Sequence, residues 1–306
     1  MGIRGWIKSF FHILRTTTEQ MNLGGIIIAI VAALCMGTMG VFSRKAGFTA
    51  EVITFFRLFI GSLFLLIFLS AKGDLRYIRT WPGWLVSLNG LLLAGFIIFY
   101  VQAMNYTTMA NAIMVLYLSP LIASLIAHFF LGERLNLTSV SLICGSLFGF
   151  AMMLNFQLGF GNESNDILGM TYALLGLCCY TGFIIINRII DINIHVYTRT
   201  YYQLLIGALC VIPFILGHFP PFSISNIMWA TGAGLIPGFL GILCAVIALS
   251  KLPTATFGTL AYFEPIFVIF LGWALFGEGL NAIQITGCII ILGCGAIKGY
   301  LATNIK

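Results

Sequence analysis

LYLSPLIASLIAHFFLGERLN, residues 116 to 136, returns 145 positions later as AYFEPIFVIFLGWALFGEGLN, residues 261 to 281. Identical residues occupy six positions of the two segments: Tyr117/Tyr262, Pro120/Pro265, Gly132/Gly277, Glu133/Glu278, Leu135/Leu280 and Asn136/Asn281. An offset of 146 aligns Arg57 with Gln203 and Gly61 with Gly207. The chain is therefore one unit duplicated, and in a membrane protein such a duplication is typical of a transporter with its site between the halves.

The composition excludes a water-soluble protein. Hydrophobic residues make up 60% of the chain, charged residues make up 8%, and the mean hydropathy is +1.05. Apolar segments long enough to span about 30 Å of hydrocarbon occupy residues 23–42, 51–70, 84–104, 109–131, 138–157, 168–187, 197–217, 227–249, 254–276 and 280–300. The sequence predicts an all-α polytopic membrane protein with ten transmembrane helices, five in each copy.

The loop charges predict the orientation, because cytoplasmic loops of membrane proteins are rich in Lys and Arg. With the N-terminus in the cytoplasm, the basic residues of that side are Arg4, Lys8, Arg15, Lys72, Arg76, Arg79, Arg134, Arg188, Arg199, Lys251, Lys298 and Lys306. Only Arg44 and Lys45 lie outside. Both termini are thus predicted to be cytoplasmic, and five helices per copy make the second repeat an inverted one.

Three segments follow from this pattern. Residues 1–21 are predicted to form a cytoplasmic amphipathic segment on the membrane surface, with a disordered basic tail as the alternative. Residues 22–157 form the first five-helix repeat and residues 168–301 form the second. The expected partners are membrane lipids and a small-molecule substrate, and no nucleic acid.

Two charges lie within the apolar segments, where each costs about 2.5 to 3.5 kcal/mol. Arg57 lies two turns into the second helix, and Glu264 lies near the middle of the ninth. We expect both to face a central cavity, where they pair with each other or with a zwitterionic substrate. The alternatives are an Arg57 that reaches the outer interface beside Glu51, and a neutral Glu264 bonded to a backbone carbonyl. A carboxyl that can change its charge also suits proton coupling, so Glu264 is the candidate coupling residue.

Pro120 and Pro265 are predicted to break the fourth and ninth helices at matching positions, and such breaks point to a transporter's binding site. Polar and aromatic residues gather around the breaks and on neighbouring helices. The predicted substrate-binding residues are Arg57, Tyr100, Asn111, Tyr117, Ser119, Tyr180, Tyr202, Gln203, Tyr262 and Glu264.

The sequence gives no sign of a metal site, a cofactor site or a catalytic centre. The eight cysteines show no CxxC spacing, and His128 has no second histidine near it, so no metal site is predicted. No nucleotide-binding loop or paired nucleophile and base is present. We therefore predict no cofactor, no catalytic residue and no enzyme activity. Glycine pairs such as Gly145 and Gly149 indicate helix packing inside the chain or between two copies, which leaves a monomer or a homodimer open.

The whole pattern resembles the EamA-type branch of the drug/metabolite transporter superfamily. The resemblance rests on ten helices in two copies, the Gly-Glu exits Gly132-Glu133 and Gly277-Glu278, Arg57 followed by Gly61, and the Phe263-Glu264-Pro265 step. It covers residues 23 to 300. It implies a carrier of the bacterial inner membrane, often an exporter of amino acids or other small metabolites. Many members have Trp-Gly in the first helix where this chain has Met36-Gly37, and the Gly-Glu glutamates resemble structural features of helix ends rather than substrate ligands.

The sequence thus favours a secondary transporter of small polar metabolites that works by alternating access, most simply an amino-acid or metabolite exporter, with proton coupling through Glu264 to be tested. An uncoupled facilitator or importer of the same fold is the first alternative. A non-transporting membrane scaffold or receptor is the alternative from another class.

Overall fold

The computed structural model describes residues 23–107, 109–133, 135–156, 164–216, 223–277 and 279–304. All regular secondary structure within these ranges is helical. Nine helical segments of the described chain are long and apolar enough to cross a membrane, and Leu137–Met153 is a shorter apolar helix. The predicted all-α polytopic fold is thereby confirmed. The predicted amphipathic segment 1–21 and Glu278 lie outside the described residues.

The two repeats follow each other along the chain. The first comprises α2 (Leu23–Gly37), α3 (Met39–Ala46), α4 (Ala50–Ala71), α5 (Arg76–Arg79), α6 (Trp84–Tyr106), α7 (Met109–Leu116), α8 (Ser119–Leu131) and α9 (Leu137–Met153). The second comprises α10 (Ser164–Ile189), α11 (Val196–Ile215), α12 (Ile224–Ala233), the π-helical segment Gly234–Gly241, α13 (Ile242–Lys251), α14 (Thr254–Ala261), α15 (Phe263–Phe276) and α16 (Ala282–Asn304).

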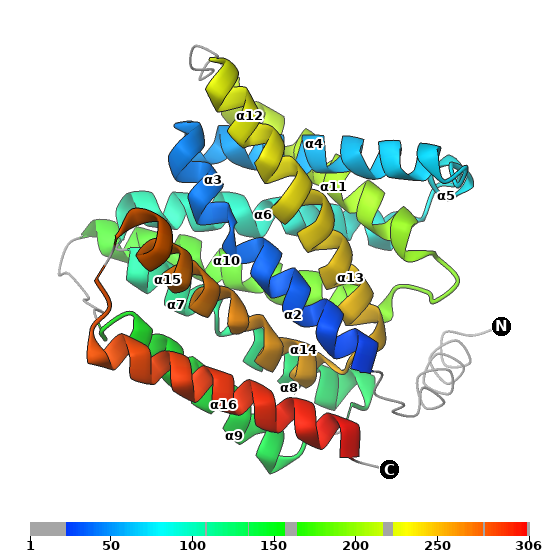
Figure 1. The fold of residues 1–306 in the computed structure, drawn as a ribbon. Coiled ribbons are helices and arrows are strands. Elements are labelled where there is room, and N and C mark those ends of the chain that lie inside the picture. The colour runs from blue at the N-terminus through cyan, green and yellow to red at the C-terminus, as the bar shows by residue number, and fades with distance from the viewer. Residues whose placement is uncertain are drawn as a thin grey trace.

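The second repeat is inverted relative to the first. α2 begins and α16 ends at the same end of the bundle (Figure 1), which we call the terminal side. Five spans precede α10, so α10 begins at the opposite end, which we call the far side. Consequently α8, α10 and α13 all end on the terminal side, where α14 begins.

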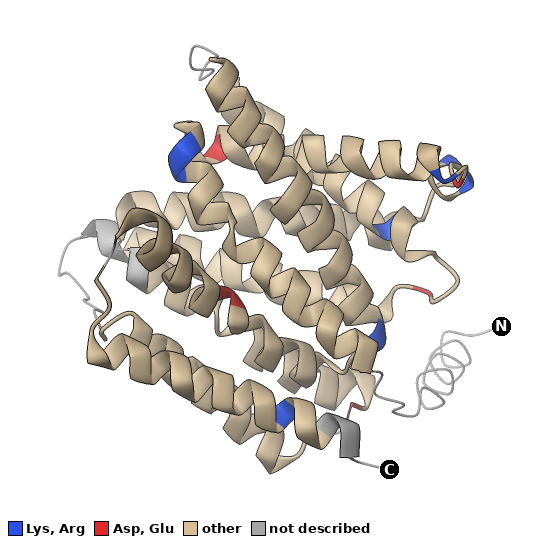
Figure 2. Cartoon of the chain, viewed as in Figure 1, with Lys and Arg blue, Asp and Glu red and all other residues tan. Residues whose placement is uncertain are grey.

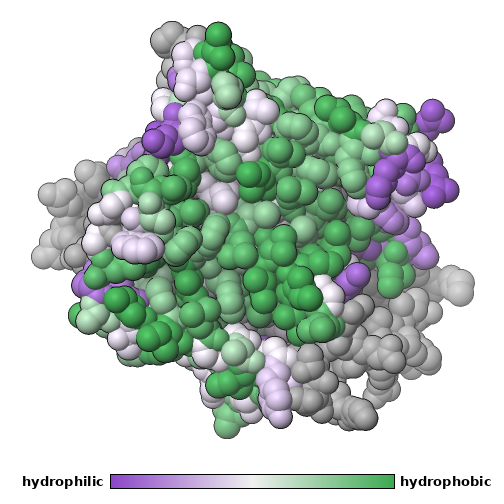
Figure 3. All heavy atoms as spheres, viewed as in Figure 1, coloured by the Kyte–Doolittle hydropathy of each residue, from purple (hydrophilic) through white to green (hydrophobic). Residues whose placement is uncertain are grey.

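Charged side chains lie mainly where the helices end. The charged residues gather mainly at the two ends of the bundle (Figure 2), and a broad apolar surface lies between them on the face drawn in Figure 3. A surface of this kind is stable only against lipid, since water would have to hydrate every exposed apolar side chain. The bundle therefore has the polarity pattern of a protein that crosses a bilayer.

The glycine pairs at the α9 and α16 interface serve packing within the chain. A Cβ added to Gly149 would lie 2.8 Å from the Gly287 carbonyl oxygen, and one added to Gly145 would lie 2.9 Å from the Cys294 sulfur. Only glycine permits so close an approach of two helices. α9 is shorter than the predicted span 138–157, because Asn155 adopts a left-handed φ of 52° just beyond its end.

Candidate functional site

The fourth and ninth spans are interrupted at equivalent positions. Tyr117 and Leu118 separate α7 from α8, and Tyr262 separates α14 from α15. Pro120 and Pro265 lie in the first turn of the helix after each break, where a missing N–H costs least. The hydroxyl of Tyr262 donates a hydrogen bond of 2.7 Å to the carbonyl oxygen of Tyr117. One break is thus bonded directly to the other, which joins the two repeats near their centre.

The first span has a break that the sequence analysis did not predict. α2 ends at Gly37 and α3 begins at Met39, and the hydroxyl of Thr38 donates a 2.6 Å hydrogen bond to the Cys35 carbonyl oxygen between them. A Cβ on Gly37 would lie 3.0 Å from the carbonyl oxygen of Glu264. The turn at Gly37 therefore presses against the start of α15, and glycine is what permits this contact.

Arg57 reaches the same place from α4. Its Nη2 contacts the thioether sulfur of Met36, and its buried Nε has no hydrogen-bond partner. No carboxylate of the described chain forms a direct ion pair with Arg57, although the charges of Arg57 and Glu264 interact at longer range. A guanidinium deep in the bundle whose acceptor is a weak one, a thioether, is incompletely compensated.

Three tyrosines complete this cluster. Tyr100, Tyr117 and Tyr180 all lie close enough to interact with the charge of Glu264. Tyr180 also interacts with Arg57. Arg57, Glu264, Tyr100 and Tyr180 are deep in the bundle and yet only partly covered. Each of the four therefore keeps part of its surface accessible, as a side chain that meets a ligand must.

Tyr202 and Gln203 are bonded elsewhere. The hydroxyl of Tyr202 donates to the carbonyl oxygen of Ile78, a residue of α5, at 3.0 Å. Gln203 is fully buried and donates to the Asn187 amide oxygen at 3.0 Å, which joins α11 to α10. The structure does not bring these two residues to Arg57 and Glu264.

Ser119 and Asn111 have local partners. Both are buried. The Ser119 hydroxyl donates to the carbonyl oxygens of Leu116 at 2.6 Å and Leu177 at 3.3 Å, so it closes the break in the fourth span and joins it to α10. Asn111 donates to the Thr107 hydroxyl at 3.2 Å.

The eighth span contains an unpredicted feature next to Arg57. Residues Gly234–Gly241 are π-helical, and Pro237 within them cannot donate the backbone hydrogen bond of an α-helix. A Cβ on Gly238 would collide with the Arg57 carbonyl oxygen. The backbone of this segment therefore packs directly on α4 at Arg57. The sequence signal for it was Pro237 with glycines close on both sides.

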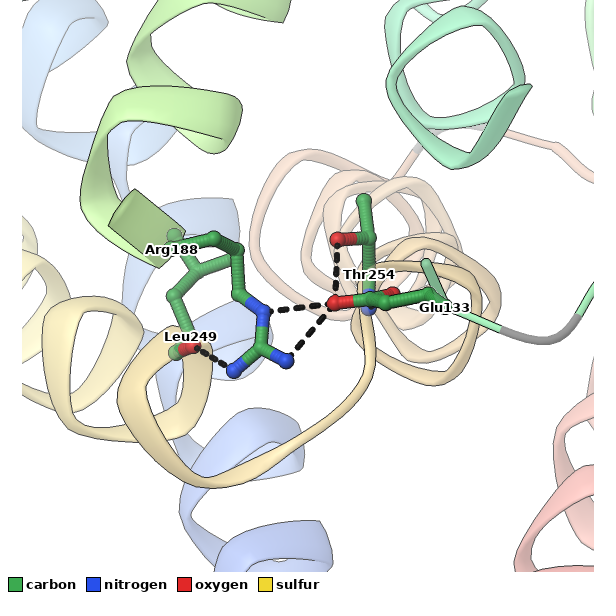
Figure 4. Close-up of polar contacts among 4 residues, drawn as sticks. All are labelled: Glu133, Arg188, Leu249 and Thr254. Atoms are coloured by element: carbon green, nitrogen blue, oxygen red, sulfur yellow. Dashed lines mark hydrogen bonds and ion pairs between the residues drawn. The ribbon is translucent and has the colours of Figure 1, made fainter. Parts of the chain in front are cut away.

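A second polar cluster, which we call the terminal latch, joins the repeats on the terminal side (Figure 4). Glu133 accepts from Arg188 Nε and Nη2, each at 2.7 Å, and from the Thr254 backbone N–H at 2.7 Å. Arg188 also donates from Nη1 to the Leu249 carbonyl oxygen at 3.1 Å. The terminal latch therefore connects the end of α8 with α10, α13 and α14 of the other repeat.

The local sequence directs Glu133 into the terminal latch. Gly132 ends α8 in the left-handed conformation with φ 69°, which glycine adopts without strain. The Glu133 N–H then donates to the Ala127 carbonyl oxygen at 3.2 Å, and His128 Nδ1 lies 2.8 Å from the Glu133 carbonyl oxygen. The carboxylate also lies at the N-terminus of α14, where the helix dipole favours a negative charge.

Comparison with known proteins gives a consistent result. The model of the EamA-like transporter family matches the chain twice, over residues 23–155 and 167–297. An uncharacterized transporter of Archaeoglobus fulgidus is 27% identical over 265 residues, covering 86% of this chain and 92% of the relative. The pseudopaline exporter CntI of Pseudomonas aeruginosa is 24% identical over 281 residues, covering 90% of this chain and 95% of the exporter. A solved crystal structure with 21% sequence identity shares the fold, with a TM-score of 0.81 over 92% of this chain and 99% of that one.

Proposed function

Since the chain belongs to the EamA-like transporter family, we propose that it is a secondary carrier that exports a small zwitterionic metabolite, of which amino acids are the simplest class. Family membership makes the chain a multi-pass membrane transporter and not an enzyme. It also decides against a non-transporting scaffold. The observation that supports a zwitterionic substrate is Arg57, a deep guanidinium with an unpartnered Nε and no direct carboxylate partner in the described chain.

The chemistry of the cluster fits such a ligand. Arg57 would bind a carboxylate, because a guanidinium pairs with carboxylates through two parallel N–H donors. Glu264 would bind an ammonium group or a proton. Tyr100, Tyr117 and Tyr180 supply phenol groups and ring faces that would orient the remainder of the ligand. A single arginine is poorly matched to a highly phosphorylated substrate, which needs several cations.

Alternating access supplies the mechanism of transport. The terminal latch bonds the two repeats together on the terminal side, which supports a carrier that is closed at that end. We assign the terminal side to the cytoplasm from the predicted loop charges, and the membrane to the inner membrane of a bacterium. In the exporting cycle the terminal latch opens for substrate entry from the cytoplasm and closes before release outside. The exporter among the relatives supports this direction.

Counterflow in proteoliposomes tests the proposal. Vesicles with purified carrier are loaded with the common L-amino acids and placed in a trace of each labelled one, without any ion gradient. We expect transient accumulation of at least one amino acid by the wild type and none by Arg57→Gln. Equal accumulation in the Arg57→Gln vesicles, or none of any amino acid in the wild type, would contradict a carboxylate-binding role for Arg57 in amino-acid transport.

An imposed gradient then separates the coupled exporter from an uncoupled facilitator. A proton gradient across the same vesicles should drive net flux if transport is coupled to protons. Flux that follows only the substrate gradient favours the facilitator, and net uptake into intact cells that produce the carrier favours an importer.

A further inference from the structure

Arg57 offers one side of its guanidinium group to the thioether of Met36. Nε and Nη2 project from the same edge of the group, with their N–H bonds nearly parallel. Nη2 contacts the Met36 sulfur, and Nε is buried and unpartnered. One edge of Arg57 is therefore half occupied by a weak acceptor and half empty.

The terminal latch shows what this edge binds when a carboxylate is available. There Arg188 uses the same two atoms, Nε and Nη2, on one oxygen of Glu133, both at 2.7 Å. Charge-assisted hydrogen bonds of this kind are about twice as strong as neutral ones. A thioether is a weak acceptor with no charge. A carboxylate that reached Arg57 would therefore displace the sulfur from Nη2 and take Nε as well.

Met36 is placed and built so that it can move away. It is the penultimate residue of α2, two positions before the break at Thr38, and its side chain is only partly buried. The π-helical segment is also close to the sulfur, since a Cβ added to Gly241 would lie 3.4 Å from it. An unbranched side chain with three rotatable bonds can adopt another rotamer at little cost.

We propose that Met36 is a specificity-determining residue: its thioether covers the Nε and Nη2 edge of Arg57 in the empty carrier, and the substrate carboxylate displaces it. The proposal rests on the proposed function, since it requires a carboxylate-bearing substrate at Arg57. The cover holds the guanidinium in place between transport events. It also sets the affinity, because every substrate must compete with the sulfur. A stronger acceptor at position 36 lowers affinity, and an apolar side chain of the same size raises it.

A thermal double-mutant cycle tests the contact without any ligand. The unfolding midpoint is measured for the purified full-length carrier as wild type, Met36→Leu, Arg57→Leu and the double variant. Leucine keeps the volume and removes the acceptor, so Met36→Leu should lower the midpoint in the wild type and have a smaller effect when Arg57 is absent. Met39→Leu, a change of the same kind just beyond the break, should show no such dependence on Arg57. Equal effects of Met36→Leu in both backgrounds would overturn the proposal.

Ligand affinity provides the second test. The probe is the L-amino acid that gives the largest counterflow signal, and its Kd is measured for three carriers. We expect Met36→Leu to bind about two- to fivefold more tightly than the wild type, as for the loss of one weak competing hydrogen bond. Met36→Gln, with a stronger neutral acceptor, should bind more weakly than the wild type. Any other order overturns the role of Met36. Failure of the proposed function is seen separately, as unchanged transport by Arg57→Gln.

Discussion

Removing the charge of Glu133 should release the terminal latch. Glu133→Gln keeps the size of the side chain and one acceptor oxygen, but it leaves the Arg188 guanidinium without its carboxylate. Breaking a fully buried pair costs about 3 to 5 kcal/mol, whereas exposed pairs contribute at most about 1 kcal/mol. The Arg188 and Glu133 side chains keep 22% and 15% of their surface exposed, so we expect about 2 kcal/mol, between these limits. That raises the ratio of open to closed terminal sides roughly 30-fold.

The Thr254 backbone N–H reports this change directly, because it donates to Glu133 Oε2. Hydrogen exchange measured by mass spectrometry on peptides that cover the start of α14 should show its protection fall by up to about 30-fold in Glu133→Gln. Arg188→Gln should have a similar effect, and the double variant should add little, since both substitutions break one pair. Asp191→Asn is the matched control on the same side of the bundle, because among the described residues its side chain accepts hydrogen bonds from Asn193 and its charge interacts with Arg199, and neither residue belongs to the terminal latch. Unchanged exchange in both single variants, or fully additive effects, would refute the terminal latch as a lock between the repeats.

Three further predictions concern the central cluster. Glu264→Gln should abolish the dependence of transport on a pH gradient while substrate exchange continues. The measurement is the substrate flux with and without the gradient. If the gradient still drives flux in Glu264→Gln, Glu264 is not the coupling residue. Gly238→Ala should lower the unfolding midpoint and the transport rate, because the added Cβ would collide with the Arg57 carbonyl oxygen. Gly293→Ala is the control and should change neither, because the space around its Cβ is open. Equal effects of the two substitutions would contradict the close packing at Gly238. Tyr262→Phe should cost about 1 to 3 kcal/mol of stability by leaving a buried carbonyl oxygen without its donor, and an unchanged midpoint would show that this bond does not join the breaks.

The length and continuous apolar character of the segments were sufficient to predict the membrane fold, since a bilayer permits few alternatives to spanning helices. The duplication then predicted matching irregularities, and the breaks at Tyr117 and Tyr262 lie where the two prolines indicated. The break at Thr38 and the π-helical segment were missed. The turn at Gly37 depends on its contact with the start of α15, which no local pattern encodes. The π-helical segment did have a local signal in Pro237 and the glycines beside it, which the sequence analysis did not use.

The candidate site was predicted in part for similar reasons. Arg57, Glu264 and three of the tyrosines lie together because a charge deep in a bilayer has few stable places other than the centre of a bundle. Gln203 was included among the predicted substrate-binding residues because it is the equivalent of Arg57 in the second repeat. A difference of one residue in the repeat offset turns a helical side chain by about 100°, and Gln203 in fact bonds Asn187 between α11 and α10.

The contact of Met36 with Arg57 and the terminal latch are evident only in the three-dimensional structure. A methionine in an apolar segment gives no signal of a polar role, and its sulfur reaches Arg57 only because α2 and α4 both pack on the π-helical segment Gly234–Gly241. Glu133 was correctly read as the end of a helix. Its partners Arg188 and Thr254 are 55 and 121 positions away in the sequence, so no local pattern could connect them.

Discrimination between a carboxylate and an amide tests the central claim most directly. The Kd of the purified wild-type carrier is compared for one transported L-amino acid and for its neutral carboxamide, and the comparison is repeated with Arg57→Gln. We predict that the wild type binds the acid at least about tenfold more tightly, as expected for a charge-assisted pair, and that Arg57→Gln loses this preference. Equal binding of acid and amide by the wild type, or a preference that survives in Arg57→Gln, would contradict Arg57 as the carboxylate site.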